Sequence, residues 1–265
     1  MTYDDFAHIR FERLEGSVLR VTIDRSGSDL NTVDGELHTE LAALFALLRN
    51  ENEARCALLT GSGRAFSAGG DFAWFPELQD PEHLEQVRRD GRSLVWDLLD
   101  VAIPVVAAVN GPAIGLGASI ALLCDVIFMA ESATIADPHV RVGIVAGDGG
   151  TVAWPLAVGP ARAKQYLLTG DPVPAAEAER IGLVNFVVEG DQLQEEALAF
   201  ARRLAAGPPL AVQYTKQAVN AWVKQTAGVS FDVATALEIA TFRSSDHSEA
   251  LNALREKRDP DFEGR

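Results

Sequence analysis

The chain has 265 residues and a mass of 28.4 kDa, and it is 48% hydrophobic and 23% charged with a formal net charge of -15 at pH 7. This length and composition are those of a globular protein with a sizeable core. The negative charge argues against a nucleic-acid partner, because binding to a phosphate backbone needs clustered Lys and Arg. Apolar runs stay shorter than about 18 residues, so we expect no membrane-spanning helix and no membrane partner.

The N-terminal stretch and the cysteines indicate the compartment. Residues 1–10 are polar, contain Asp4 and Asp5, and do not resemble a signal or transit peptide. We therefore expect a cytoplasmic protein. Cys56 and Cys124 each lie within an apolar run, so we expect two small core residues and neither a disulfide nor a catalytic thiol.

Strands alternate with helices in the first half of the chain. The patterns predict a strand over 17–25, a helix over 35–51 and a short buried strand over 56–61. They further predict a helix over 82–101, a buried strand over 103–111, a short apolar helix over 117–125 and strand residues within 126–137. Apolar strands separated by helices favour an α/β fold with a mostly parallel sheet.

The last third of the chain is predicted to be helical. One further strand is expected over 183–189, followed by helices over 191–207, 210–224 and 229–242. We place a domain boundary near Gly190, with an α/β core over 1–190 and a helical region over 191–265.

Two glycine-rich segments each follow a predicted strand. They are "RAFSAGGDF" (64–72) and "NGPAIGLGAS" (110–119), and the second opens a helix. Glycines let backbone N–H groups approach a ligand closely, and a helix N-terminus adds positive partial charge, so the two segments together can bind an oxyanion. Either segment alone is better explained as a tight turn. Neither has the dinucleotide or P-loop pattern.

The segment "DPHVRVGIVAGDGG" (137–150) places His139 nine residues before Asp148, with glycines on both sides of the aspartate. Nine residues span up to about 30 Å when extended but can also fold back, so the spacing fits either an acid/base pair or a turn. No His, Cys and carboxylate cluster has the spacing of metal ligands, and we expect no metal. The remaining histidines lie in polar contexts and are expected to be solvated: His8, His38, His83 and His247.

Taken together, these segments resemble the enoyl-CoA hydratase/isomerase (crotonase) superfamily over nearly the whole chain. The resemblance rests on "DLNTVDGELHTEL", "AFSAGGDF", "NGPAIGLGASIALLCDVIF", "ARAKQYLLTGDPVPAAEAERIGLVNFVV" and "LREKRDPDF". It implies a crotonase-like spiral of ββα units with a C-terminal helical region that assembles as a homotrimer or dimer of trimers. It also implies an acyl-CoA substrate, with coenzyme A as part of the substrate and no tightly bound cofactor.

The resemblance assigns roles to individual residues. The backbone N–H groups of Ala68 and Leu116 would form an oxyanion hole for the thioester carbonyl. Asp71 and Asp125 would be structural carboxylates. The implied substrate contacts are Ser67, Gly69, Gly70, Asp71, Gly115, Ser119 and, from a neighbouring subunit, Lys257.

The chain departs from the hydratase pattern at the two catalytic glutamates, whose positions hold Ser119 and His139. A serine is a poor general base, so simple hydration is disfavoured. The segment from Pro138 to Pro155 instead resembles the beta-diketone hydrolase branch typified by 6-oxocamphor hydrolase. That likeness implies that His139 activates water, that Asp148 orients the imidazole or stabilises its charge, and that Glu238 supports the site. A histidine of that branch is replaced here by Leu116.

Three functions remain open at this point. The first is an acyl-CoA enzyme that stabilises a thioester enolate in the oxyanion hole. The second is hydrolysis of a carbon-carbon bond in a cyclic beta-diketone, and the third is a non-catalytic protein that binds CoA esters. In the last case His139 would be a packed histidine, Asp148 would shape its glycine turn, and Glu238 would face solvent from an amphipathic helix.

Overall fold

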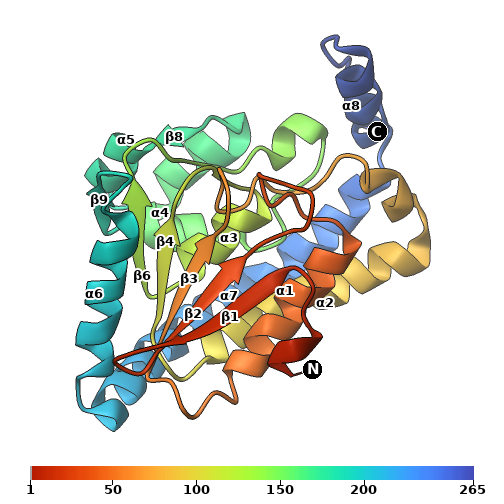
Figure 1. Ribbon diagram of the computed structural model, residues 1–265. Coiled ribbons are helices and arrows are strands. Elements are labelled where there is room, and N and C mark those ends of the chain that lie inside the picture. Colours follow the sequence, from red (N-terminus) through yellow and green to blue (C-terminus); the bar gives the residue numbers. More distant parts are fainter. Residues whose placement is uncertain (1) are drawn as a thin grey trace.

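The computed structural model describes residues 2–265, and Met1 of the polar N-terminal stretch lies outside this range. A six-stranded sheet forms the centre of the molecule (Figure 1). Its strands, in spatial order, are β1 (Ile9–Leu14), β2 (Val18–Ile23), β3 (Cys56–Gly61), β4 (Val105–Val109), β6 (Val126–Ala130) and β9 (Phe186–Val188). All neighbouring pairs are parallel except the antiparallel pair of β1 and β2. The expected α/β fold with a mostly parallel sheet is confirmed.

The central strands carry continuous apolar sequence because both faces of the sheet are covered. Every residue of β4 is buried, and only the final glycine of β3 is partly exposed. Helix α6 (Leu193–Ala205) packs across β2, β3, β4 and β6. A separate group of helices packs together: α1 (Gly35–Leu48), α2 (Pro81–Asp100), α3 (Leu116–Leu123), α4 (Gly150–Thr169) and α7 (Pro209–Phe242).

A second, three-stranded sheet lies beside the functional loops. It consists of β5 (Ala113–Ile114), β7 (Thr134–Ala136) and β8 (Val173–Pro174). Short helices fill the connections: η1 (Tyr3–Asp5), η2 (Phe75–Gln79), η3 (His139–Val142) and α5 (Ala175–Arg180). Because β5 leads directly into α3 and β7 leads into η3, this small sheet fixes the two loops that carry the candidate site residues.

The C-terminal region after α6 consists of two further helices. Residues predicted as two helices, 210–224 and 229–242, form the single helix α7. Gly228 lowers helix propensity without blocking the helix, and the flanking Ala227 and Phe231 are fully buried, so packing carries the helix through the glycine. The final helix, α8 (Ser245–Glu256), projects from the body of the molecule in Figure 1. No helix within residues 2–265 has the length and apolar character needed to cross a bilayer.

Several buried polar residues were not foreseen. Both cysteines are buried as expected, but the prediction of solvated histidines is wrong for His8, His38 and His247, whereas His83 is exposed. Each of the buried rings has a polar partner that offsets its loss of water. His8 lies 3.2 Å from a Glu36 oxygen, His38 lies near Asp90, and Nδ1 of His247 lies 2.7 Å from the Val142 carbonyl oxygen.

Candidate active site

Two neighbouring hollows both have His139 in their walls. The main cleft comprises about 610 Å³, part of it open to solvent, and is lined by residues of η2, α2, α7, the first glycine-rich loop, the start of α3 and the loop before α4. A side cavity of about 400 Å³ lies against the first glycine-rich loop. Four residues line both hollows: Gly70, Phe75, His139 and Ile144. The imidazole therefore borders both hollows.

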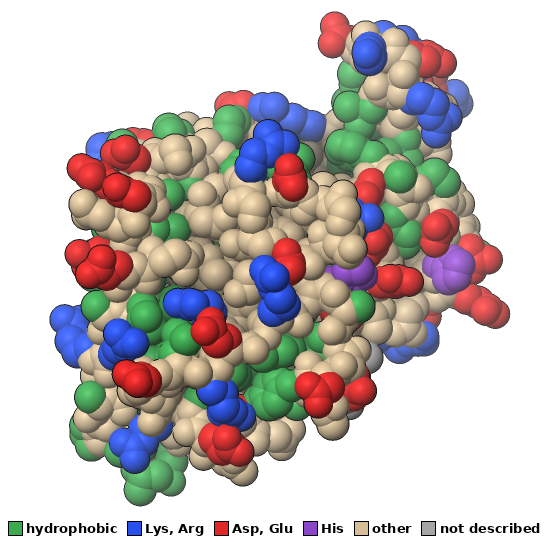
Figure 2. Space-filling view, viewed as in Figure 1, with side chains coloured by type: hydrophobic (Ala, Val, Ile, Leu, Met, Phe, Trp, Pro, Cys, Tyr) green, Lys and Arg blue, Asp and Glu red, His purple; other side chains and the backbone are tan. Residues whose placement is uncertain are grey.

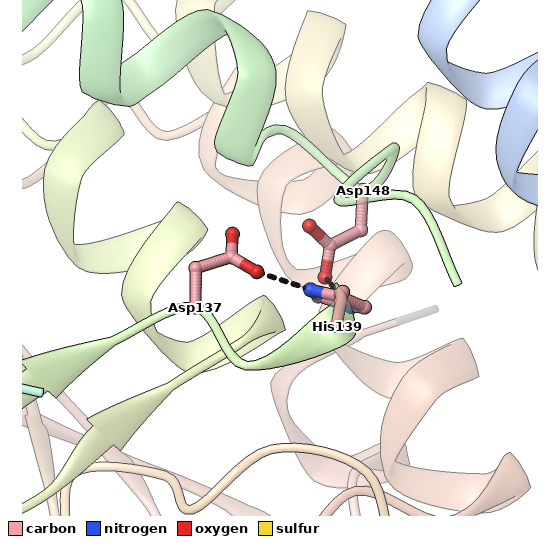
Figure 3. Close-up of side chains that lie close together, drawn as sticks. All are labelled: Asp137, His139 and Asp148. Carbon is pink, nitrogen blue, oxygen red and sulfur yellow. Dashed lines mark hydrogen bonds and ion pairs between the residues drawn. The ribbon is translucent and has the colours of Figure 1, made fainter. Parts of the chain in front are cut away.

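The imidazole of His139 lies between two carboxylates (Figure 3). Asp137 follows the last residue of β7, and its Oδ1 is hydrogen-bonded to Nδ1 of His139. On the other side of the ring, Nε2 lies 3.4 Å from Oδ2 of Asp148. The chain between His139 and Asp148 thus folds back, and the two residues share one site.

The charges around His139 favour its protonated form. Burial alone would lower the pKa of His139, but the negative charges of Asp137 and Asp148 outweigh it and hold the pKa well above the ordinary value of 6.5. The two carboxylates therefore favour the imidazolium form of the ring.

Ser119 supports Asp148 and does not line either hollow. Its side chain is fully buried, and Oγ donates a hydrogen bond to Oδ1 of Asp148 over 2.9 Å. Burial alone would raise the pKa of Asp148, but His139, this hydroxyl and the N–H of Gly150 hold it below the usual value. The serine therefore stabilises the ionised form of Asp148.

Asp137 is a functional candidate that the sequence analysis missed. It is 1% exposed, and its second oxygen, Oδ2, has no hydrogen-bond partner among residues 2–265. Helix α4 begins against this carboxylate, because a Cβ at Gly150 would lie 2.0 Å from Oδ2. Only a glycine fits there. The one available signal was an acidic residue two positions before His139 at the end of a predicted strand.

Glu238 reaches the site from α7. It is 8% exposed and lines the main cleft together with His139 and Asp148, so it does not face solvent. Its approach requires Gly147, where a Cβ would lie 2.5 Å from Cβ of Glu238. Burial, and then the negative charge of Asp148, raises the pKa of Glu238 well above its ordinary value. The raised pKa favours the protonated carboxyl group, which can act as a proton donor in the cleft.

The first glycine-rich loop offers a different amide from the one expected. The N–H of Ala68 donates to the carbonyl oxygen of Leu30 over 2.9 Å, so it is not available to a ligand. The backbone of Val33 forms a parallel bridge with Gly70 through hydrogen bonds to the residues before and after it, Gly69 and Asp71. In such a bridge the N–H of Gly70 points away from Val33. No protein atom among residues 2–265 accepts from the N–H of Gly70 or from that of Leu116.

Gly70 and Leu116 both line the main cleft, and Leu116 is the first residue of α3. Free N–H groups at a helix N-terminus and in a glycine loop are the usual parts of an oxyanion site. The structure thus retains Leu116 as a candidate donor and replaces Ala68 by Gly70.

The other residues implied by resemblance fall into three groups. Ser67 is fully buried and donates to the Asn31 carbonyl oxygen, and Asp71 forms an ion pair with Arg25 at 2.7 Å, so both have structural partners. Gly69 and Gly115 line the side cavity. Lys257 is exposed at the end of α8, outside both hollows of its own chain.

Asp137, His139 and Asp148 also offer oxygen and nitrogen atoms within 4.8 Å of one another, the arrangement of a candidate metal site. However, each ring nitrogen of His139 faces its own carboxylate. The ion pairs on the two sides of the ring account for this geometry without a further group.

Replacing Glu238 by Gln tests its protonation state through stability. Because the pKa of Glu238 is raised in the folded protein, the unfolded chain ionises first, and the wild type loses stability as the pH rises above about 4.5. The Gln variant avoids this loss, which grows by up to about 1.4 kcal/mol per pH unit. Denaturant unfolding should show equal stabilities near pH 4 and a more stable variant at pH 7. Equal stabilities at both pH values would mean that Glu238 is ionised in the folded protein.

Comparison with known proteins agrees with this architecture. Residues 13–265 match the sequence model of the enoyl-CoA hydratase/isomerase family. The short-chain-enoyl-CoA hydratase of Clostridium acetobutylicum is 35% identical, with 92% of this chain and 93% of that protein covered.

Two solved structures are also similar. An enoyl-CoA hydratase/isomerase from Mycobacterium paratuberculosis is 41% identical with a TM-score of 0.88, covering 93% of this chain and 98% of its own. A beta-diketone hydrolase from Anabaena, bound to (S)-3-oxocyclohexyl acetic acid, is 32% identical with a TM-score of 0.85, covering 91% and 96%. The chain has the crotonase fold and belongs to the enoyl-CoA hydratase/isomerase family of enzymes.

Proposed function

We propose that this enzyme cleaves a cyclic beta-diketone by hydrolysis. The bond that breaks joins one carbonyl carbon to the central carbon between the two carbonyl groups. The observation that carries the proposal is the imidazole of His139, held between the buried carboxylate of Asp137 and the partly buried carboxylate of Asp148, beside the free amides of Gly70 and Leu116. Such a set supplies a base for water and a site for an oxyanion. The similar Anabaena protein, a beta-diketone hydrolase, supports this choice.

The reaction starts from neutral His139. Asp137 fixes the proton on Nδ1, so Nε2 is the atom that accepts a proton from water. The hydroxide oxygen bonds to one carbonyl carbon, and the resulting oxyanion is bound by the N–H groups of Gly70 and Leu116. The carbonyl then re-forms, the bond to the central carbon breaks, and its electron pair leaves as the enolate of the second carbonyl.

Glu238 completes the proton balance. Its protonated carboxyl group gives a proton to the central carbon of the enolate, which yields a carboxylic acid and a ketone on the opened ring. The proton held by His139 then passes to the Glu238 carboxylate, directly or through water. One molecule of water is consumed, and the protein returns to its starting state.

An acyl-CoA thioester is the second candidate substrate, because an enolate-stabilising amide pair suits it equally and the curated relatives include enoyl-CoA hydratases. Two features disfavour it. The two catalytic glutamates of the hydratase pattern are absent. In addition, a neighbouring groove, which shares three lining residues with the main cleft, is acidic. This groove contains one arginine and five carboxylates: Arg25, Asp34, Glu36, Asp71, Glu77 and Asp90. Figure 2 shows red acidic side chains around the histidines on that side of the molecule, a surface that repels phosphates.

A direct assay separates the candidate functions. We expect the enzyme to open a cyclic 1,3-diketone and to hydrate crotonyl-CoA slowly, because Ser119 and His139 do not replace two glutamates. His139→Ala should reduce diketone turnover by about 10²–10⁴-fold. Retention on immobilised coenzyme A would favour the thioester reading. Efficient crotonyl-CoA hydration without diketone cleavage would overturn the proposal, and binding of CoA esters without any turnover would indicate a binding protein.

The pH dependence of turnover tests Asp137. Because the pKa of His139 is raised, the neutral base forms only at higher pH, and kcat/KM should rise with pH above 6.5. Asp137→Asn removes one of the negative charges that raise this pKa, so the rise should move to lower pH. The maximal rate should also fall by about 10²-fold or more, because the ring loses its fixed tautomer. A profile that keeps its position in the variant would exclude Asp137 as the partner of the base.

We propose a homotrimer or a dimer of trimers as the assembly. Helix α7 exposes apolar side chains along one stripe, at Val219, Trp222, Val229, Val233 and Leu237. An exposed stripe of this length suits a subunit interface. In such an assembly Lys257 of one subunit would contribute to a neighbour's cleft.

Sedimentation at micromolar concentration should give three or six times the chain mass. Trp222→Glu should lower that mass, because it places a charge in the stripe. A wild-type monomer would contradict the proposed assembly.

A further inference from the structure

We propose that Gly91 of α2 forms a subsite that admits a bulky apolar part of the substrate, remote from the reacting carbonyl. This proposal depends on the proposed function only for the reaction chemistry at His139. Gly91 lies in the interior of a 20-residue helix, is buried, and lines the main cleft. A Cβ built on it meets no atom within 4 Å, so the space beyond it is open cleft.

This empty space is unusual for a buried helical position. Glycine lowers helix stability relative to alanine, and buried helix positions normally carry side chains that fill the interior. Gly228 of α7 is the other glycine within an unkinked helix whose built Cβ meets no atom within 4 Å. It is exposed and borders none of the hollows described above. Of these two glycines, only Gly91 leaves room inside a binding cleft.

The walls around Gly91 indicate the chemistry of the group that fits. Apolar side chains from three elements line the cleft, among them Leu78, Val87 and Phe242. Two arginines flank Gly91 on α2, but Arg88 pairs with Glu85 at 2.6 Å and Arg92 pairs with Asp232 at 2.9 Å. Since both guanidinium groups already have carboxylate partners, this end of the cleft does not require an anion. It suits an uncharged ring or branched chain.

The subsite also agrees with the way polar and apolar residues are distributed along the cleft. His139, Asp148 and Glu238 lie at the reacting part of the cleft, whereas α2 contributes Val87, Gly91 and the two carboxylate-paired arginines. A substrate with its reacting carbonyl at the amides of Gly70 and Leu116 would place its remaining carbon atoms along the apolar walls. A side chain at Gly91 would shorten this space and would leave the proton-transfer groups untouched.

Ligand binding tests the subsite without requiring turnover. Two uncharged ketones serve as probes, small cyclopentanone and bulky adamantan-2-one, with dissociation constants measured by ligand-observed NMR. Gly91→Leu should weaken adamantan-2-one binding by at least tenfold and change cyclopentanone binding by less than twofold. Gly228→Leu is the matched control and should change neither. Gly91→Ala and Gly228→Ala should each raise the melting temperature by about 2–4 °C, which checks the fold.

The outcomes are distinct. Unchanged adamantan-2-one binding in Gly91→Leu, an equal loss in Gly228→Leu, or no binding of this ketone by the wild type at millimolar concentration would each overturn the subsite. A wild type that binds the bulky ketone through Gly91 but opens no cyclic diketone would sustain the subsite and contradict the proposed reaction.

Discussion

The paired contacts of the His139 ring are the interaction on which the site depends. Two carboxylates make these contacts, and four separate parts of the chain converge around them. The end of β7 supplies Asp137, α3 supplies Ser119, the loop before α4 supplies Asp148, and α7 brings Glu238. A charge buried without a partner is strongly destabilising, so removing one of these groups affects all the others.

The charges around His139 explain why its neighbours differ from the two catalytic glutamates of the hydratase pattern. Ser119 fills the position of one expected glutamate and donates to Asp148, so a carboxylate there would face another carboxylate and lose that hydrogen bond. Glu238 is tolerated because its raised pKa keeps it neutral beside Asp148. The charges therefore favour a cation at His139, two carboxylate anions and a neutral acid at Glu238. Once His139 has lost the proton on Nε2, that atom can accept a proton from water, and Glu238 can deliver one.

Local patterns in the sequence predicted much of the fold. Buried apolar runs identified β3 and β4, and helical spacing identified α1, α2 and α6 to within a few residues. The strand β1 was missed because only one of its residues is fully buried. The break predicted within α7 was wrong because tertiary packing outweighs one glycine. Motif likeness located the two glycine loops, but only coordinates show that Ala68 donates to Leu30 while Gly70 stays free. Asp137 was missed because its role depends on the path of η3 and α4, which spacing does not reveal.

The central claim is that Asp137 and Asp148 keep His139 protonated on both nitrogens at neutral pH. Nitrogen NMR of protein labelled with ¹⁵N-histidine, with His139→Gln to assign the signal, measures this directly. The account predicts that both ring nitrogens of His139 have imidazolium shifts at pH 7 and that the signal titrates only above 6.5. A neutral ring at pH 7, or titration below 6.5, would contradict it.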